Sequence, residues 1–287
     1  MMPGSDFLKV RKTLEPKKMR ETKKVKNFIL AALAALLMLC LAACKMQHGV
    51  TGSGENLPKL VVGSDEYAPY VYYGKNNEIE GIDVELAKEV CRRIGRKFVF
   101  KEIKWDEKDS YLESGDVDCL WGSFSMNGRE DDYMWTEPYN VSRQVVVVRT
   151  DSGITKLSEL EGKRVAVQSS TKPEEIFLNR SNSNVPSVDK VFSFVGIDEI
   201  FAALSRGYVD ACSGHEEALR YHMKNLAESY RVLDEPIAVS RIGVAFAKNG
   251  DSELVSQVSN ALVEMKNDGT VDSILKKYTT TPVTESE

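Results

Sequence analysis

Two parts of the chain carry groups suited to holding a small anion. Arg129 follows Ser-Phe-Ser-Met-Asn-Gly at 123–128, and a guanidinium can hold a carboxylate through two parallel hydrogen bonds. Alternatively, Arg129 pairs with Glu130 or Asp131 at the surface. The turn 169–174 separates a strand-like run from a helical one, and the free N–H groups of a helix N-terminus attract anions. Both parts therefore carry groups that can attract an anion.

The same turn carries residues typical of a helix start. Thr171 and Glu174 have the spacing of a capping box, and Pro173 suits the first turn of a helix. The turn is therefore an ordinary helix cap, an anion site, or both.

Strands and helices alternate along the part of the chain that must position these residues. The run 59–64 is a short apolar strand, and 97–103 alternates as a second strand. Between them, 81–95 has a helical stripe of apolar residues, with Asp83 as its expected cap and Gly95 as its end. This order predicts an α/β fold with a mostly parallel sheet.

The chain also repeats a short pattern, which predicts two similarly built lobes. Residues 112–118 match 204–210 at Leu-x-x-Gly-x-Val-Asp, where a helix ends at the glycine and a buried strand follows. We expect the segment after 242 to return to the first lobe, because it is too short for a third domain. The expected division is lobe 1 at 58–140 and 242–280, lobe 2 at 141–241, and a tail at 281–287.

Composition excludes several classes of partner. Without residues 1–43, the chain has 29 basic and 40 acidic residues, which argues against binding nucleic acid. Three histidines and the absence of HExxH and CxxC motifs predict neither a metal site nor a cofactor. We expect the thiols of Cys91, Cys119 and Cys212 to be buried as small hydrophobic groups.

The N-terminus reads as a targeting segment. A basic stretch at 17–26 precedes an apolar run at 28–41 that is too short to span a membrane comfortably. Leu-Ala-Ala before Cys44 resembles the lipobox of bacterial lipoproteins, in which that cysteine is acylated. We expect 1–43 to be a signal peptide, 44–57 a flexible tether, and the protein to be exported and lipid-anchored to the outer face of the cytoplasmic membrane or in the periplasm. The alternative is an N-terminal membrane helix.

An ordered set of motifs over 58–278 resembles the family 3 extracellular solute-binding proteins, which are polar amino-acid receptors of ABC transporters. The resemblance implies a two-lobed, type II periplasmic-binding-protein-like fold, with a ligand cleft between lobes joined by two crossing strands near 138–143 and 238–242. It also implies a monomeric binding protein, not an enzyme, that delivers an amino acid or a relative to a membrane permease. The motifs include Val62–Asp65, Gly81–Leu86, Gly115–Asp118, Tyr133–Tyr139, Leu157–Val167 and Asp268–Thr270.

The resemblance also implies a set of ligand-binding residues. Arg129 would clamp the ligand's α-carboxylate from the first lobe, and the turn with Thr171 would grip it from the second. Aromatic residues would wall the pocket, although each has an alternative role in the core. The full set is Asp65, Tyr67, Trp105, Gly122, Phe124, Arg129, Gln168, Thr171, Lys172, His215 and Glu216.

Two positions depart from the family's pattern. His215 stands where the family usually has the aspartate that holds the ligand's α-amino group, and Phe124 stands where Ser or Thr is usual. Our hypothesis is that Glu216 holds the ligand's α-amino group in place of the missing aspartate. Alternatively, the ligand lacks a standard α-amino group. His215 would also make recognition depend on pH.

Two other functions are compatible with the same fold. Some exported dehydratases of prephenate-like acids resemble it, and His215 or Glu216 would supply the acid that they need. A sensory domain that signals through a membrane partner is a third interpretation. We expect transport rather than either.

Overall fold

The computed structural model describes residues 57–278 apart from 225 and 228. The expected signal peptide, Cys44, the tether up to residue 56 and the tail at 281–287 lie outside the described residues. Within the described part, no helix is both long enough and apolar enough to cross a membrane.

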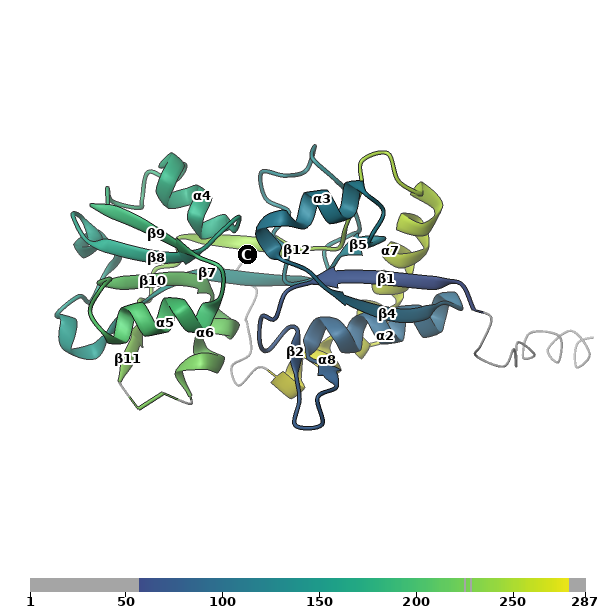
Figure 1. Ribbon diagram of the computed structural model, residues 1–287, viewed down its shortest axis with the longest axis horizontal. Coiled ribbons are helices and arrows are strands. Elements are labelled where there is room, and N and C mark those ends of the chain that lie inside the picture. The colour runs from purple at the N-terminus through teal and green to yellow at the C-terminus, as the bar shows by residue number, and fades with distance from the viewer. Residues whose placement is uncertain (1–56, 225, 228, 279–287) are drawn as a thin grey trace, which may run out of the picture. The chain divides into compact units, whose positions relative to one another are not determined.

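The first lobe contains a five-stranded sheet in the order β4-β1-β5-β13-β6 (Figure 1). The strand β1 is parallel to β4 and β5, whereas β13 is antiparallel to β5 and β6. A late part of the chain therefore completes this sheet. Its strands are β1 (Lys59–Ser64), β4 (Lys97–Glu102), β5 (Cys119–Leu120), β6 (Met134–Trp135) and β13 (Ala245–Phe246), with a separate hairpin of β2 (Tyr72–Tyr73) and β3 (Ile79–Glu80).

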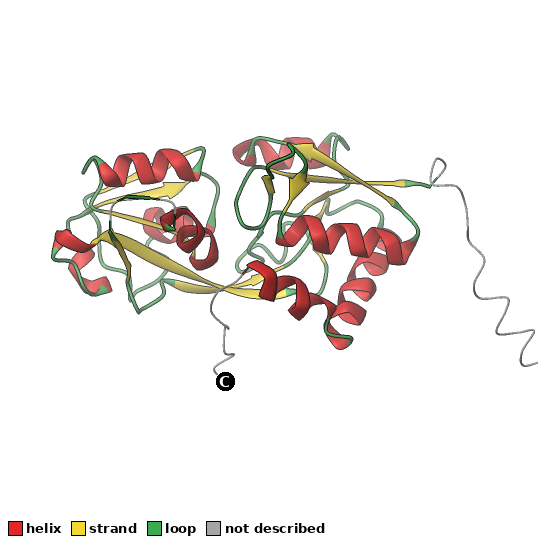
Figure 2. Ribbon diagram, turned by 90° about the horizontal axis from the view of Figure 1, so that it is seen from below, coloured by secondary structure: helices red, strands yellow, loops and turns green. Residues whose placement is uncertain are grey.

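Helices lie on both faces of this sheet (Figures 1 and 2). The helix α2 buries Ile82, Leu86 and Val90, which is most of the predicted apolar stripe, and ends at Gly95 in the left-handed conformation. The helices are α2 (Ile82–Ile94), α3 (Lys108–Glu113), α7 (Ser252–Asn267) and α8 (Thr270–Tyr278), with a short 3-10 turn η1 (Trp105–Glu107).

The second lobe contains a six-stranded sheet in the order β11-β7-β10-β8-β9, with β12 paired to β7. In Figure 1, α4 lies on one side of this sheet and α5 and α6 lie on the other. Its strands are β7 (Asn140–Arg149), β8 (Arg164–Gln168), β9 (Lys190–Phe194), β10 (Ala211–His215), β11 (Tyr230–Val232) and β12 (Ala238–Ile242). Its helices are α4 (Lys172–Asn179), α5 (Ile197–Ser205) and α6 (Glu216–Met223), with the 3-10 turns η2 (Thr150–Ser152) and η3 (Leu157–Leu160).

Two strands cross between the lobes, as the predicted fold class requires. The strands β7 and β12 pair antiparallel from Ala238 opposite Gln144 to Ile242 opposite Asn140. Ile242 also forms a bridge with Ser125 of the first lobe. The fold is therefore the predicted two-lobed α/β fold. The exact lobe boundaries remain a prediction.

The repeated Leu-x-x-Gly-x-Val-Asp pattern forms the same joint in both lobes. Asp118 accepts a hydrogen bond from the N–H of Val61 at 2.6 Å, and Asp210 accepts one from the N–H of Arg164 at 2.8 Å. Each aspartate also donates its own N–H to the carbonyl of the same partner, at 2.8 Å in both cases. The pattern therefore fixes how the strand that follows the helix aligns with its parallel neighbour. The three cysteines at 91, 119 and 212 are buried free thiols, as predicted.

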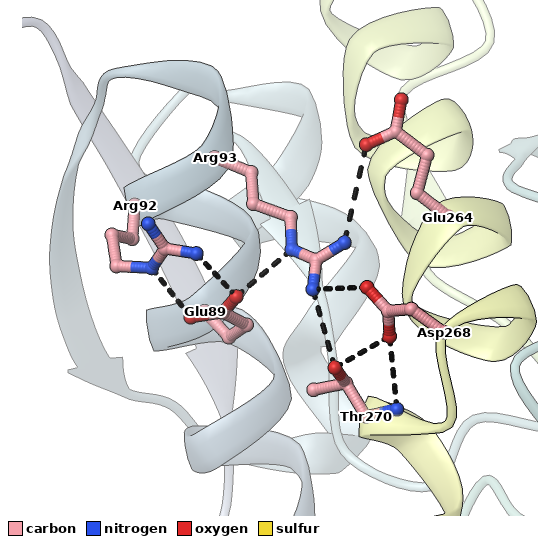
Figure 3. Close-up of polar contacts among 6 residues, drawn as sticks. All are labelled: Glu89, Arg92, Arg93, Glu264, Asp268 and Thr270. Carbon is pink, nitrogen blue, oxygen red and sulfur yellow. Dashed lines mark hydrogen bonds and ion pairs between the residues drawn. The ribbon is translucent and has the colours of Figure 1, made fainter. Parts of the chain in front are cut away.

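A polar network holds the C-terminal helices against α2 (Figure 3). The guanidinium of Arg93 contacts Glu89 on its own helix at 2.8 Å, and Asp268 and Thr270 at 2.7 and 3.2 Å. The side chain of Arg93 is 17% exposed, whereas that of its neighbour Arg92 is 69% exposed. The network therefore joins segments that lie far apart in the sequence.

We expect Arg93→Ala to lower the free energy of unfolding by about 1–3 kcal/mol, because a mostly buried guanidinium loses its hydrogen bonds to Glu89, Asp268 and Thr270. The matched control is Arg92→Ala, which removes only an exposed pair with Glu89 and should cost at most about 1 kcal/mol. Urea titration of both variants measures the difference. Equal losses in the two variants would contradict a special role for Arg93.

Candidate functional site

A cavity lies where the two sheets meet, and residues of both lobes line it. Its empty volume is about 530 Å³, including the space open to solvent at its mouth. Ten of the eleven predicted site residues line it, and Glu216 lies outside the set of described lining residues. Those ten are Asp65, Tyr67, Trp105, Gly122, Phe124, Arg129, Gln168, Thr171, Lys172 and His215.

Arg129 is held at the edge of this cavity by contacts from both lobes. Its guanidinium donates to the carbonyl of Ser125 at 3.3 Å and lies 3.3 Å from the carboxylate of Glu175 on α4. It also lies 5.5 Å from the centre of the Phe124 ring. Glu130 pairs with Arg241 at 2.7 Å, so this neighbour of Arg129 has a different partner. The geometry favours Arg129 as a cation of the cavity over Arg129 as a surface partner of Glu130.

The turn before α4 lines the cavity from the second lobe, but the predicted capping box is wrong. The hydroxyl of Thr171 donates to the carbonyl of Gln168 at 2.6 Å. Glu174 accepts from the N–H of Ser170 at 2.6 Å, one residue before the predicted partner. The cause is the positive φ of Ser170, 60°, which turns its N–H toward the helix. Thr171 is still the N-cap residue of α4, and Pro173 lies in the first helical turn as predicted.

Glu175 was missed by the sequence analysis and lies between two cations. Its two carboxylate oxygens lie 2.6 Å from the Lys172 ammonium and 3.3 Å from the Arg129 guanidinium. The spacing of three residues from Lys172 indicates a pair within the helix. The contact with Arg129 depends on the packing of the two lobes, which no local pattern reports.

A second contact across the cavity joins Asp65 to Gln168. The side-chain amide of Gln168 donates to the Asp65 carboxyl at 2.6 Å and to the carbonyl of Val195 at 3.0 Å. Burial raises the pKa of Asp65 to about 7, although the hydrogen bond from Gln168 acts in the opposite direction. These two residues lie at the carboxyl ends of β1 and β8, so the ends of parallel strands meet here as the fold requires.

Aromatic rings wall the cavity. Trp105 and Phe124 meet edge to face with ring centres 5.0 Å apart, and Tyr67 meets the His215 ring edge to face at 6.1 Å. The ammonium of Lys108 lies 5.6 and 5.7 Å from the centres of the Trp105 and Phe124 rings, and burial lowers its pKa. The wall therefore offers flat apolar surface to a ligand.

His215 is a neutral group in this structure. Burial lowers its pKa to about 3, so the imidazole does not titrate between pH 5 and 8. Its Nδ1 lies 2.9 Å from the hydroxyl of Ser142, and its Nε2 lies 3.0 Å from the side-chain amide of Gln144. The expected pH dependence through His215 is therefore not supported by this geometry.

Glu216 lies at the start of α6 and forms ion pairs with two arginines. Its carboxylate lies 3.0 Å from Arg143 and 2.7 Å from Arg220. The hypothesis that it holds the ligand's amine has no support from this placement.

Asp83 has a different role from the predicted cap of α2. Gly81 is the N-cap residue, and Asp83 lies inside the helix and is 1% exposed. Its carboxyl accepts from the N–H of Ser123 at 2.7 Å and from the hydroxyl of Tyr139 at 2.8 Å. Ser123 has a φ of 51°, so this hydrogen bond supports the strained turn that places Phe124 in the cavity. Burial raises the pKa of Asp83 to about 7.

Several lining residues were not predicted: Ser123, Ser125, Gln144, Ser170, Pro173, Ile197, Ile200, Ser213, Gly214 and Leu219. Gln144 directly precedes the apolar run 145–148 of β7, and Ser213 follows Ala211 and Cys212 in the buried strand β10. A buried polar residue next to such a run is the signal that could have found them.

Two α/β lobes joined by paired crossing strands, with a cavity at their junction, define a solute-binding protein. Bacterial extracellular solute-binding proteins, family 3, match residues 60–281, and the chain belongs to this family. It is 31% identical over 223 residues to the L-cystine-binding protein TcyA of Bacillus subtilis (strain 168). The aligned region covers 76% of this chain and 80% of that protein.

Solved structures agree with this assignment. The crystal structure of Tv2483 bound to L-arginine has a TM-score of 0.70 and 28% identity, over 77% of this chain and 90% of that one. The ancestral amino-acid-binding protein AncCDT-1, a precursor of cyclohexadienyl dehydratase, has a TM-score of 0.68 and 29% identity, over 77% of this chain and 95% of that one.

We expect Asp83 to make stability fall as pH rises from about 4 to 7. Its pKa is 3.8 when exposed and about 7 in the fold, so the folded state keeps a proton that the unfolded state has released. This proton contributes on the order of 4 kcal/mol to the free energy of unfolding below about pH 4, and the contribution is lost as the pH rises through 7.

The free energy of unfolding of the wild type minus that of Asp83→Asn, measured at pH 4 to 8, isolates this effect. It should fall steadily across the range, because asparagine does not ionise; its amide oxygen can still accept from the N–H of Ser123, and its NH2 group can donate to the hydroxyl oxygen of Tyr139. Asp106→Asn, at an exposed aspartate, is the control and should give a nearly flat difference. A flat difference for Asp83→Asn would show that its pKa is ordinary.

Proposed function

We propose that this protein is the substrate-binding component of an ABC importer, which binds an amino acid or a related small carboxylate and delivers it to a membrane permease. The observation that carries the proposal is the pair of cations, Arg129 and Lys172, that line one cavity from opposite lobes. A ligand carboxylate that takes the place of Glu175 between them contacts both lobes at once, so binding favours the closed arrangement. The relatives named for cystine and arginine support an amino-acid-like ligand.

Binding without turnover is part of the proposal. A dehydratase needs a positioned acid beside the carboxylate clamp, and the two residues expected to supply it do not fit that role. His215 is neutral with a pKa near 3, and Glu216 is paired with two arginines outside the cavity. Because the chain is similar to a precursor of cyclohexadienyl dehydratase, dehydratase activity is tested with the same set of ligands.

The binding proposal is tested by thermal unfolding of the domain from residue 52 onward against the twenty amino acids, their N-acetyl and 2-hydroxy forms, and prephenate-like acids. A ligand at about 100 times its dissociation constant should add roughly 2.7 kcal/mol of stability. Arg129→Ala should weaken binding by about 30-fold or more, because the ligand's carboxylate loses the guanidinium with which it pairs in the cavity.

The matched control is Arg92→Ala, at an exposed arginine on α2, which should leave the shift intact. Stabilisation by none of these carboxylates, or binding unaffected by Arg129→Ala, would contradict the proposal. Loss of water and carbon dioxide from a prephenate-like acid would support the dehydratase instead.

We also propose that the mature protein is monomeric, exported and lipid-anchored through Cys44. The proposal rests on the sequence of residues 1–44, with its basic start, short apolar run and Leu-Ala-Ala-Cys ending. In cells fed a labelled fatty acid, Cys44→Ser should abolish labelling and release the protein from the membrane fraction. Cys40→Ser, four residues earlier in the same segment, is the control and should keep both. Labelling that survives Cys44→Ser would refute the anchor.

A further inference from the structure

The part of the cavity next to Arg129 is built from neutral polar side chains. Arg129 donates to the carbonyl of Ser125, whose hydroxyl lies 3.4 Å from the side-chain amide of Gln144. That amide lies 3.0 Å from Nε2 of His215. We call Ser125, Gln144, Ser213 and His215 the neutral cluster; all four line the cavity and are at most 8% exposed.

The hydrogen bonds of the cluster fix which groups remain to receive a ligand. The hydroxyl of Ser142 donates to Glu217 at 2.7 Å, and its oxygen lies 2.9 Å from Nδ1 of His215. Nε2 of His215 lies 3.0 Å from the side-chain amide of Gln144. The hydroxyl of Ser213 donates to the carbonyl of Val145.

Gln144 retains an unused acceptor. Within the described part of the chain, its Oε1 is buried and has no hydrogen-bond partner. A buried acceptor without a partner is unfavourable, and an N–H or O–H group of a ligand satisfies it. The hydroxyl oxygen of Ser213 can accept as well, because its hydrogen is already used. The cluster therefore presents acceptors to a hydrogen-bond donor.

No negative charge lies beside these acceptors among the described residues that line the cavity, apart from that of Asp65. Asp65 is bonded to Gln168 rather than to the cluster. Glu217 accepts from Tyr70 and Ser142, and lies outside the lining set. At the anchoring end the cations Arg129 and Lys172 share the carboxylate of Glu175, at 3.3 and 2.6 Å, so this negative charge is already paired and is not free to hold an ammonium.

We propose that the ligand is a carboxylate whose neighbouring carbon bears a neutral donor, an acylated nitrogen or a hydroxyl, in place of a free ammonium. A neutral N–H or O–H satisfies Gln144 without bringing in a charge. An ammonium placed there is buried beside neutral acceptors without a free carboxylate to pair with, which is unfavourable. The inference rests on the proposed function, because it takes Arg129 as the carboxylate anchor.

The test compares matched ligands by calorimetry, using the side chain that stabilises the protein most in the thermal screen. The free amino acid, its N-acetyl form and its 2-hydroxy form differ only at the group in question. Wild-type protein should bind one of the neutral forms at least about tenfold more tightly than the amino acid. His215→Asp, which places a carboxylate in the cluster, should reverse the preference, and the neutral control His215→Asn should preserve it.

Two results would overturn the inference while leaving the proposed function intact. One is that the wild type binds the free amino acid more tightly than either neutral form. The other is that Asp65→Asn no longer binds the free amino acid, because that result would place the ligand's ammonium at Asp65. If His215→Asp fails to fold, the wild-type comparison alone decides. If Arg129→Ala leaves binding of all three forms unchanged, the proposed function itself is wrong.

Discussion

The antiparallel pairing of β7 with β12 is the contact on which the site depends. Gln144 lies opposite Ala238 in this pair, and the two strands continue from the second sheet toward the first. Because β1 and β8 both end near this junction, residues at their carboxyl ends lie opposite each other. Asp65 and Gln168 come within 2.6 Å in this way. The position of the cavity is therefore a consequence of strand pairing. Strand ends place Asp65, Gln168 and His215, whereas the connection 121–133 between β5 and β6 places Phe124 and Arg129.

Much of this arrangement could be predicted from the sequence, because it depends on local patterns. The Leu-x-x-Gly-x-Val-Asp pattern indicated two similar lobes, and in both of them the aspartate holds the start of the neighbouring strand. The polar run before Arg129 and the turn at Thr171 indicated an anion site, and both line the cavity. Such predictions succeed when a residue's role is decided within a few positions of the chain.

The errors arose where tertiary contacts decide the outcome. Asp83 has the position of a helix cap, but it is drawn into the core by Ser123 and Tyr139 from distant segments. Glu174 bonds one residue earlier than its spacing indicates, because the backbone at Ser170 adopts a positive φ. Gln144 could be seen as the polar residue that precedes the apolar run 145–148, but its unsatisfied acceptor depends on how neighbouring strands pack.

The contacts Asp65–Gln168 and Arg129–Glu175 are both made across the cavity by the protein's own side chains. They stabilise the contact between the lobes independently of any ligand. Less binding energy is then used to bring the lobes together, but a ligand carboxylate must displace Glu175 to reach Arg129. The same contacts reduce the difference between free and ligand-bound protein in the fraction of molecules that are closed. A membrane partner must therefore recognise more than the closed shape to distinguish ligand-bound from free protein.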